Sequence, residues 1–218
     1  MSKIKIESPK IHPDLRSANF HDIFYEEEPE LINCTVVNSQ ADNEVIDKVV
    51  FSKVIFKNTT FINCTFMNID MTDVVFENCN LSNTRMCEGI IHRSVFKDCK
   101  LLGADFSGAN LGNVHFENCD LNLSNFTETR LKQVRFEETS LRSANFFDSK
   151  LNKVRLNHCD LNDVDFTQTI LKGMDISTCT YEQINVTAES LKGCEVSPNQ
   201  AIEFSRLLGL KIKEGISF

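Results

Sequence analysis

Apolar residues recur at every fifth position through most of this chain. All thirty such positions from Phe51 to Val196 hold Phe, Leu, Met, Ile, Val or Tyr. An average protein has roughly 45–50% apolar residues, so an unbroken run of this length does not arise by chance. The same frame extends back to Leu31, with Ala41 as its weakest large position. A period of five fits neither a 3.6-residue helix nor a simple alternating strand.

A second inward position lies two residues before each large one. It is usually small or modest in size, as at Val54, Ala104 and Cys119, and Glu189 is the clear exception. The other three positions of each five are polar. This pattern predicts a short extended segment followed by a tight turn. Asn suits such a turn because it tolerates left-handed backbone, and it stands two residues after the large position at Asn58, Asn63, Asn68, Asn78, Asn83, Asn113 and Asn118.

A longer period of twenty also runs through the chain. Phe recurs in one series from Phe56 to Phe136 and in another from Phe106 to Phe166, while Leu fills the series between them. Four five-residue sides should therefore close one square coil, with Phe columns on two opposite sides. Residues 31–196 then form roughly eight coils, stacked about 4.8 Å apart into a rod of about 40 Å. We expect an all-β solenoid.

Both ends of the chain depart from the repeat. Residues 1–30 should form an N-terminal cap or irregular first coil, because Ala18 and Phe20 repeat the inward pair one residue out of frame. The acidic segment Glu26 to Glu30 falls at this slip and predicts a solvated loop, whose further role the sequence leaves open. A solenoid end exposes unpaired backbone, so a cap is needed there.

Residues 197–218 predict a C-terminal helix and tail. Ser197 is placed to cap the helix, Pro198 to occupy its first turn and Gln200 to complete a capping box. The helix should run from Pro198 to Leu208 and stop at Gly209, and residues 210–212 could add a short strand. Exposed apolar residues on a cap favour a homodimer contact. The candidates are Ala201, Ile202, Phe204, Leu207, Leu208 and Leu210.

The nine cysteines have a packing role in this frame. Eight of them occupy the small inward position, and only Cys87 lies outside it. A buried free cysteine behaves as a small hydrophobe, so neither a disulfide framework nor a zinc site is indicated. The chain has no apolar run near 18 residues and no secretory signal is visible. We therefore expect a cytoplasmic protein with reduced thiols.

The sequence shows no pattern typical of an enzyme. The five His residues have no metal-ligand spacing, and no nucleotide-binding or hydrolase motif is present. A coil filled with side chains also lacks a pocket, so we expect no catalytic site, no metal and no cofactor. The net charge of −8 argues against direct nucleic-acid binding. Function should come from the outer surface.

Two segments carry a family resemblance. Ala104-Asp105-Phe106-Ser107-Gly108 and Ala109-Asn110-Leu111-Gly112-Asn113 match the A(D/N)LXX signature of the pentapeptide-repeat family. That resemblance implies a right-handed quadrilateral β-helix. The C-terminal stretch from Ser197 to Ile212 is similar to the end of the Qnr quinolone-resistance subfamily, and the last coils are similar to its Gram-positive members.

The resemblance implies a rod that dimerises through its C-terminal helix. It also implies binding to DNA gyrase and topoisomerase IV by mimicry of DNA, with protection of these enzymes from quinolones. Four outward carboxylates are the candidate phosphate mimics: Asp105, Asp120, Asp160 and Asp165. Two features differ from many Qnr proteins. The frame has no loop insertion, and one stretch is locally basic, with Arg130, Lys132, Arg135, Arg142, Lys150, Lys153 and Arg155.

Two other functions remain open on the sequence. Proteins of this family include immunity factors that protect a producer from its own gyrase-targeting toxin or peptide. A structural scaffold with an unrelated protein partner is the third reading.

Overall fold

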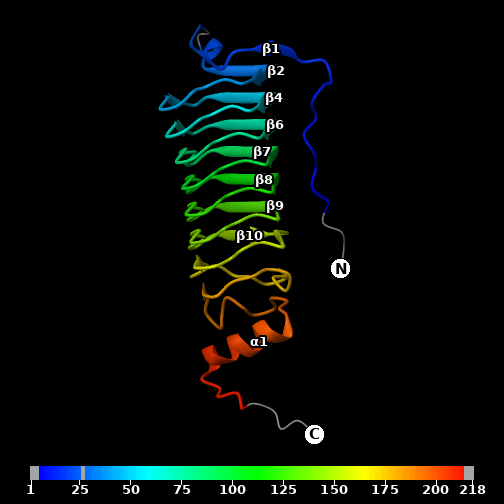
Figure 1. Ribbon diagram of the computed structural model, residues 1–218, viewed down its shortest axis with the longest axis vertical. Helices are drawn as coiled ribbons and strands as arrows, with labels where there is room; N and C mark the ends of the chain where they lie inside the picture. Colours follow the sequence, from blue (N-terminus) through cyan, green and yellow to red (C-terminus); the bar gives the residue numbers. More distant parts are fainter. Residues whose placement is uncertain (1–4, 26–27, 214–218) are drawn as a thin grey trace.

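Each coil pairs with the next at an offset of twenty residues. The computed structural model describes residues 5–25 and 28–213. Six eight-residue strands stack in parallel, so that Phe56 lies beside Phe76 and Phe76 beside Phe96 (Figure 1). They are β2 (Glu30–Val37), β4 (Val50–Lys57), β6 (Asp70–Glu77), β7 (Ile90–Lys97), β8 (Asn110–Glu117) and β9 (Arg130–Glu137). The result is the expected β-solenoid, with about eight turns.

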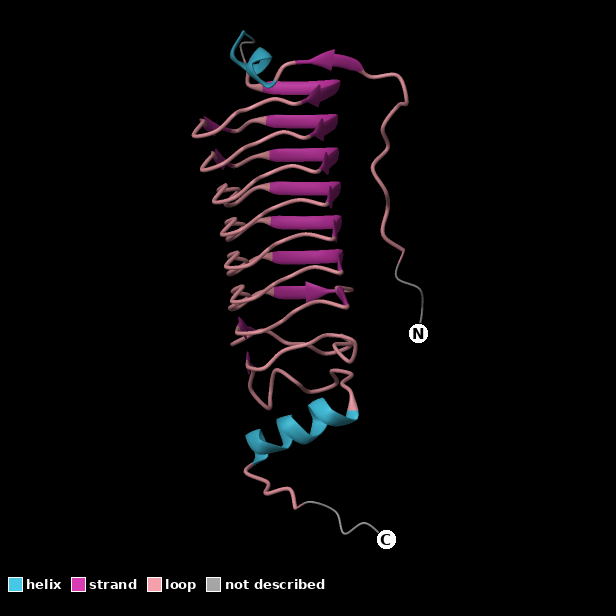
Figure 2. Ribbon diagram, in the orientation of Figure 1, coloured by secondary structure: helices cyan, strands magenta, loops and turns pink. Residues whose placement is uncertain are grey.

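Shorter strands complete the stack. In the same sheet, β1 (Arg16–Ala18) pairs with β2 at the N-terminal end, and β10 (Lys150–Asn152) and β11 (Arg155–Asn157) pair with β9. Two smaller sheets form elsewhere on the coils, from β3 (Val45–Asp47) with β5 (Thr65–Met67), and from β12 (Val164–Asp165) with β13 (Ile184–Asn185). Figure 2 shows strands along the body and helical segments only at its two ends.

The corners of the coil impose left-handed backbone. Every fifth residue from Asn33 to Gly173 has a positive φ, between 46° at Arg93 and 77° at Gly173. This confirms the turn predicted from the Asn positions. Asn side chains also bond from coil to coil, since Asn78 Nδ2 donates to Asn58 Oδ1 at 2.7 Å. The same geometry is forced on residues that tolerate it less well, such as Leu123.

The two Phe columns fill opposite sides of the interior. Phe96, Phe116 and Phe136 stack with ring centroids 4.9 Å apart. Phe126 and Phe146, in the other column, stack at 4.6 Å. The columns meet edge to face, as the near-perpendicular rings of Phe126 and Phe136 show. All these rings are almost fully buried, so the predicted columns are confirmed.

The cysteines pack as the frame predicts. All nine are free, and all but Cys194 are buried. Cys119 Sγ donates to the carbonyl oxygen of Phe96 at 3.3 Å, on the preceding coil. Burial raises the pKa of the Cys64 thiol to about 11, so this side chain is protonated at neutral pH. Cys87, which does not occupy the inward position, is also buried, and its Sγ accepts a hydrogen bond from Ser107 Oγ at 3.4 Å.

The N-terminal end is closed by residues 16–25. β1 pairs with β2 at an offset of 18, as Arg16 opposite Cys34 shows, so the frame does slip here. The 3₁₀ helix Phe20–Tyr25 then buries Phe20, whose ring centroid lies 5.2 Å from that of Phe61. Glu26 and Glu27 of the acidic segment lie outside the described residues.

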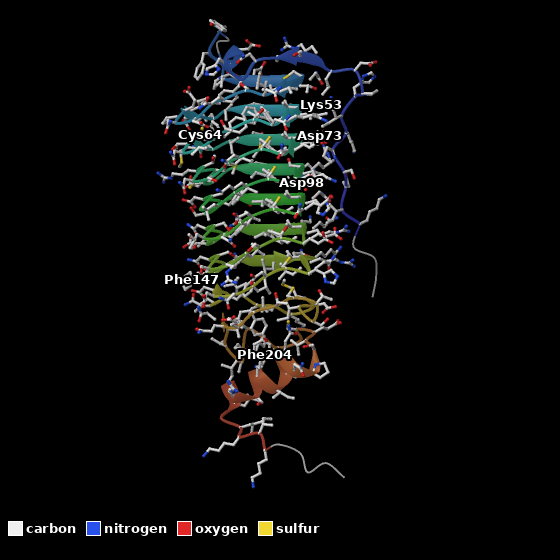
Figure 3. The ribbon with its side chains drawn as sticks, viewed as in Figure 1. Lys53, Cys64, Asp73, Asp98, Phe147 and Phe204 are labelled. Atoms are coloured by element: carbon white, nitrogen blue, oxygen red, sulfur yellow. The ribbon has the colours of Figure 1, made fainter. Side chains whose placement is uncertain are left out.

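An outer strap, residues 5–14, was not predicted from the sequence. It runs along the outside of the rod toward the C-terminal end (Figure 1), on the side where Figure 3 labels Asp73. The backbone N–H of Lys10 donates to Asp73 Oδ1 at 2.9 Å. Further along, Gln133 Nε2 donates to the carbonyl oxygen of Lys5 at 2.8 Å. The strap therefore ties several coils together.

The last coil is locally irregular at Glu189, although its register with the preceding coil keeps the offset of twenty at Asp175 and Glu195. Glu189 is exposed and Ser190 is buried in its place, which explains the one exception among the small positions. The helix α1 (Pro198–Phe204) has the predicted capping box between Ser197 and Gln200. A 3₁₀ turn, Ser205–Leu208, continues it to Gly209. The short strand suggested for residues 210–212 is wrong, because they pair with no strand of the described chain.

Loss of one stacked ring should destabilise the rod. Phe116→Ala removes a ring that stacks on Phe96 and Phe136, and should cost about 3–5 kcal/mol of unfolding free energy. Urea denaturation followed by circular dichroism measures this. Phe147→Ala is the control, because Phe147 occupies an outward position and is partly exposed (Figure 3). An equal loss in both variants would contradict the role assigned to the column.

Relief of backbone strain at one corner should increase the free energy of unfolding. Leu123 has a φ of 60° and is 62% exposed. Leu123→Asn should therefore raise the unfolding free energy by about 1 kcal/mol. The same urea titration measures it. Leu102→Asn, on the same side of the rod but outside the positive-φ positions, should bring no gain.

Candidate binding surfaces

Apolar side chains fill the interior of the rod, so its binding surfaces are expected on the outside. The coil centres hold the buried apolar core. Among residues 5–25 and 28–213, no three His, Cys, Asp or Glu side chains gather closely enough to hold a metal ion. Within the same part of the chain, no helix has the length and apolar character to cross a membrane. The outside of the rod carries two kinds of charged surface and an apolar end.

The four candidate phosphate mimics fall in two outward columns, as expected from the period. A series of parallel bridges links Asp105 through Asn125 and Asn145 to Asp165. Another links Asp120 through Ser140 to Asp160. The four are thus brought onto two sides of the rod rather than into one cluster.

Each of these carboxylates also has a structural task. Asp105 Oδ1 accepts the backbone N–H of Ser107 at 3.0 Å, which closes the turn of its own coil. The same bond forms at the other three candidates, from Asn122 to Asp120, Asn162 to Asp160 and Thr167 to Asp165. The Asp or Asn of the repeat signature is therefore explained by turn formation. A partner would meet carboxylates that are already partly satisfied.

Ionisation of Asp105 is secured by its surroundings. Burial acts to raise its pKa, but hydrogen bonds from Ser107 and Cys87 and the charge of Arg85 together leave the pKa lowered. Arg85 Nε lies 3.9 Å from Asp105 Oδ2, and Arg142 Nη1 forms a shorter ion pair of 3.0 Å with Asp160 Oδ2. That pair neutralises one of the predicted mimics.

The acidic corner, formed by Glu88, Glu128 and Asp148, was missed by the sequence reasoning. These three residues occupy the left-handed position at one corner, where Gly108 stands on the coil between Glu88 and Glu128. All three are exposed, and none forms an ion pair in the described structure. By the coil spacing, Glu128 and Asp148 are about 4.8 Å apart along the axis, and Glu88 is about 10 Å from Glu128. The sequence signal that could have revealed them is the acidic residue at turn positions separated by multiples of twenty.

The basic stretch is divided by the fold. Arg142 lies on the side of Asp160, and Arg135 Nη1 lies 3.5 Å from Glu137 Oε2. Arg130, Lys132 and Lys150 lie together on another side, in strands β9 and β10. A run of like charges in the sequence thus becomes one concentrated patch and several compensated pairs.

The six candidate dimer residues gather at the C-terminal end of the rod. Ile202, Leu207, Leu208 and Leu210 are 46–67% exposed. Phe204 is half-buried, and its ring stacks on Tyr181 with centroids 5.8 Å apart (Figure 3). Ala201 lines the apolar groove of about 290 Å³ that lies between α1 and the last coil. The end of the rod is therefore an apolar surface without a partner in this structure.

Comparison with known proteins identifies the repeat. A family model described as "Pentapeptide repeat region" matches residues 69–146 and 89–166, and one described as "Pentapeptide repeats (8 copies)" matches residues 51–86. Together they span residues 51–166, more than half of the 218-residue chain. No curated protein sequence matches the chain.

Solved structures of the same architecture resemble the rod at low identity. A trypsin-treated form of QnrB1, a plasmid-mediated fluoroquinolone resistance protein, is 17% identical with a TM-score of 0.48, covering 85% of this chain and 99% of its own. HetL, a pentapeptide repeat protein involved in heterocyst differentiation regulation in Nostoc sp. strain PCC 7120, is 15% identical with a TM-score of 0.47, covering 77% and 83%. A pentapeptide repeat protein of the Arabidopsis thaliana thylakoid lumen is 12% identical with a TM-score of 0.31, covering 60% and 73%.

The family models and the coil geometry agree on every element of the repeat. The inward pair, the left-handed corner and the period of twenty all occur through the matched residues. This chain belongs to the pentapeptide-repeat family.

Proposed function

We propose that this protein is a non-enzymatic rod that binds type II topoisomerases, DNA gyrase and topoisomerase IV, and protects them from quinolones. The observation that carries the proposal is the acidic corner, Glu88, Glu128 and Asp148. Its carboxylates are exposed, have no ion-pair partner in the part of the chain that the structure describes, and are held on a stack of paired coils. A cytoplasmic location would suit this role, because the nine free thiols would stay reduced there.

The physical basis of the proposal is competition for a basic groove. Duplex DNA presents one negative charge per about 1.7 Å of its axis. A stiff rod with aligned carboxylates can occupy the same groove, because its charges are already ordered and little entropy is lost on binding. Asp165 lies on the side next to the acidic corner and extends its charge, whereas Asp105 in the same column lies 3.9 Å from Arg85 Nε.

The apolar C-terminal end supports a second part of the proposal, a homodimer joined end to end. Ile202, Leu207 and Leu208 would be buried against the same residues of a second copy, as in a two-fold interface. Such a dimer doubles the length of the rod, so that one acidic corner lies on either side of the junction.

The topoisomerase proposal is tested by neutralising the acidic corner. Purified protein should inhibit the access of DNA to gyrase and reduce ciprofloxacin-stabilised cleavage. Glu128→Gln with Asp148→Gln should raise the half-effective concentration about three- to tenfold, since each exposed charge contributes up to about 1 kcal/mol. A supercoiling and cleavage titration measures both effects.

The matched control removes two carboxylates that are already neutralised. Glu77 and Glu117 lie 2.8 Å and 2.7 Å from Lys57 and Lys97. Glu77→Gln with Glu117→Gln changes the net charge equally and should shift the titration little. Absence of any effect from the unmodified protein would end the topoisomerase proposal, and equal shifts in both variants would remove the acidic corner from it.

The dimer proposal is tested at one exposed leucine. Leu208 is 67% exposed, so Leu208→Glu should leave folding intact while placing a charge in the apolar contact. Light scattering after size exclusion should then give the monomer mass. Leu123→Glu is the control, because Leu123 is comparably exposed on the side of the rod. A dimer that persists in Leu208→Glu would exclude this end as the interface.

A further inference from the structure

The basic panel is a cluster of five cations on one side of the rod: Arg130, Lys132, Lys150, Lys153 and Lys172. All five are exposed. Arg130 and Lys132 belong to β9 and Lys150 to the adjacent β10, both labelled in Figure 1. Lys153 lies at the next corner, and Lys172 lies one coil beyond. Within residues 5–25 and 28–213, none of the five forms an ion pair or a side-chain hydrogen bond.

The panel contains like charges in direct register. Arg130 lies opposite Lys150 on the neighbouring strand, about 4.8 Å away. Like charges at this separation repel, and a sheet normally avoids them. The outward positions of this side from Asn110 to Lys172 hold no Asp or Glu, so nothing on the panel compensates the repulsion.

The adjacent side of the rod carries charges that are compensated by ion pairs. There Lys57 lies in register with Glu77, and Lys97 with Glu117. Their Nζ to carboxylate distances are 2.8 Å and 2.7 Å. Glu117 also lies in register with Glu137 on that side, and Arg135 with Arg155. These like charges are compensated, because Glu137 lies 3.5 Å from Arg135 and Glu117 lies 2.7 Å from Lys97. The register of Arg130 and Lys150 differs because neither residue has a carboxylate within ion-pair distance among the described residues, so a bound anionic partner would relieve the repulsion.

We propose that the basic panel is a docking surface for an acidic, extended segment of a partner protein. Alternate side chains on an extended chain lie about 6.6 Å apart on one face. Arg130 and Lys132 have this separation, because they alternate on β9. A segment with Asp or Glu at every second position, lying along β9, would place its carboxylates on this pair, and Lys150 and Lys153 would reach the same carboxylates from the next coil.

The borders of the panel favour a peptide over a nucleic acid. Glu128 and Asp148 lie along one corner and would repel any anionic ligand that extends past it, so the panel fits only a short acidic segment. At the other corner, the outer strap contacts Gln133. The panel extends only about 10 Å along the rod, from Lys132 to Lys172. A protein that grips DNA typically makes six to ten phosphate contacts, and this chain has a net charge of −8.

The test is a binding measurement with a defined probe. Fluorescein-labelled (Glu-Ser)₄ is titrated with the full chain at 50 mM NaCl, and fluorescence anisotropy gives Kd. We expect binding at roughly 10–100 µM, which weakens as salt is raised. Arg130→Gln with Lys150→Gln should weaken it at least fivefold. The peptide (Gln-Ser)₄ should not bind.

The matched control is Lys57→Gln with Lys97→Gln, which removes the same charge from compensated pairs and should change Kd less than twofold. Thermal unfolding gives a second readout with opposite signs. The Tm should not fall in the panel variant, because repulsion is relieved, and should fall slightly in the control. Absence of peptide binding, or an equal loss of affinity in both variants, would overturn the proposal. Tighter binding of an eight-nucleotide single strand or a twelve-base-pair duplex than of the peptide would show that the panel binds nucleic acid and would overturn the proposal.

Discussion

In-register stacking of one coil on the next is the constraint from which the rest of this structure follows. Parallel pairing at an offset of twenty places each side chain about 4.8 Å from its counterparts on neighbouring coils. A residue that stacks well on its own kind is therefore repeated along a column. Phe does so through ring stacking, as at Phe96–Phe116, and Asn through hydrogen bonds between side-chain amides, as at Asn58–Asn78. Charge cannot follow this rule without cost, since like charges in a column repel.

This constraint explains why the fold was predictable from the sequence. Residues twenty apart stack on one another and must pack together, so the period of twenty is visible in the sequence from Phe51 onward. The inward pair, the Phe columns and the corner turns all followed from it. Where local chemistry departs from the period, as at Glu189, the turn changes locally and Ser190 becomes buried instead, while the offset of twenty is kept at Glu195. The departure was visible in the sequence, but its resolution depended on the packing of the last coil.

The outer strap and the binding surfaces could not be predicted in the same way. The strap contacts the body through residues that share no period with it, and Lys10 and Asp73 are 63 positions apart. The candidate carboxylates were found correctly as columns. Their turn-closing bonds, such as that from Ser107 to Asp105, were not foreseen because they depend on backbone orientation within one coil. The acidic corner was missed for a related reason: corner positions were judged by their turn propensity, and their charge was not considered.

The left-handed corners offer a place where charge can be exposed freely. A side chain at a corner points away from both adjoining sides, so it makes few contacts with its own coil. Glu128 and Asp148 remain without partners there, although Arg130 and Lys150 lie only two residues further along the chain. Opposite charges that could have neutralised one another are instead separated onto a corner and a flat side. Because the coil stack is rigid, this separation is preserved along the rod, and a partner can meet one sign of charge without meeting the other. A single narrow protein can in this way present an acidic edge to one partner and a basic side to another at the same time.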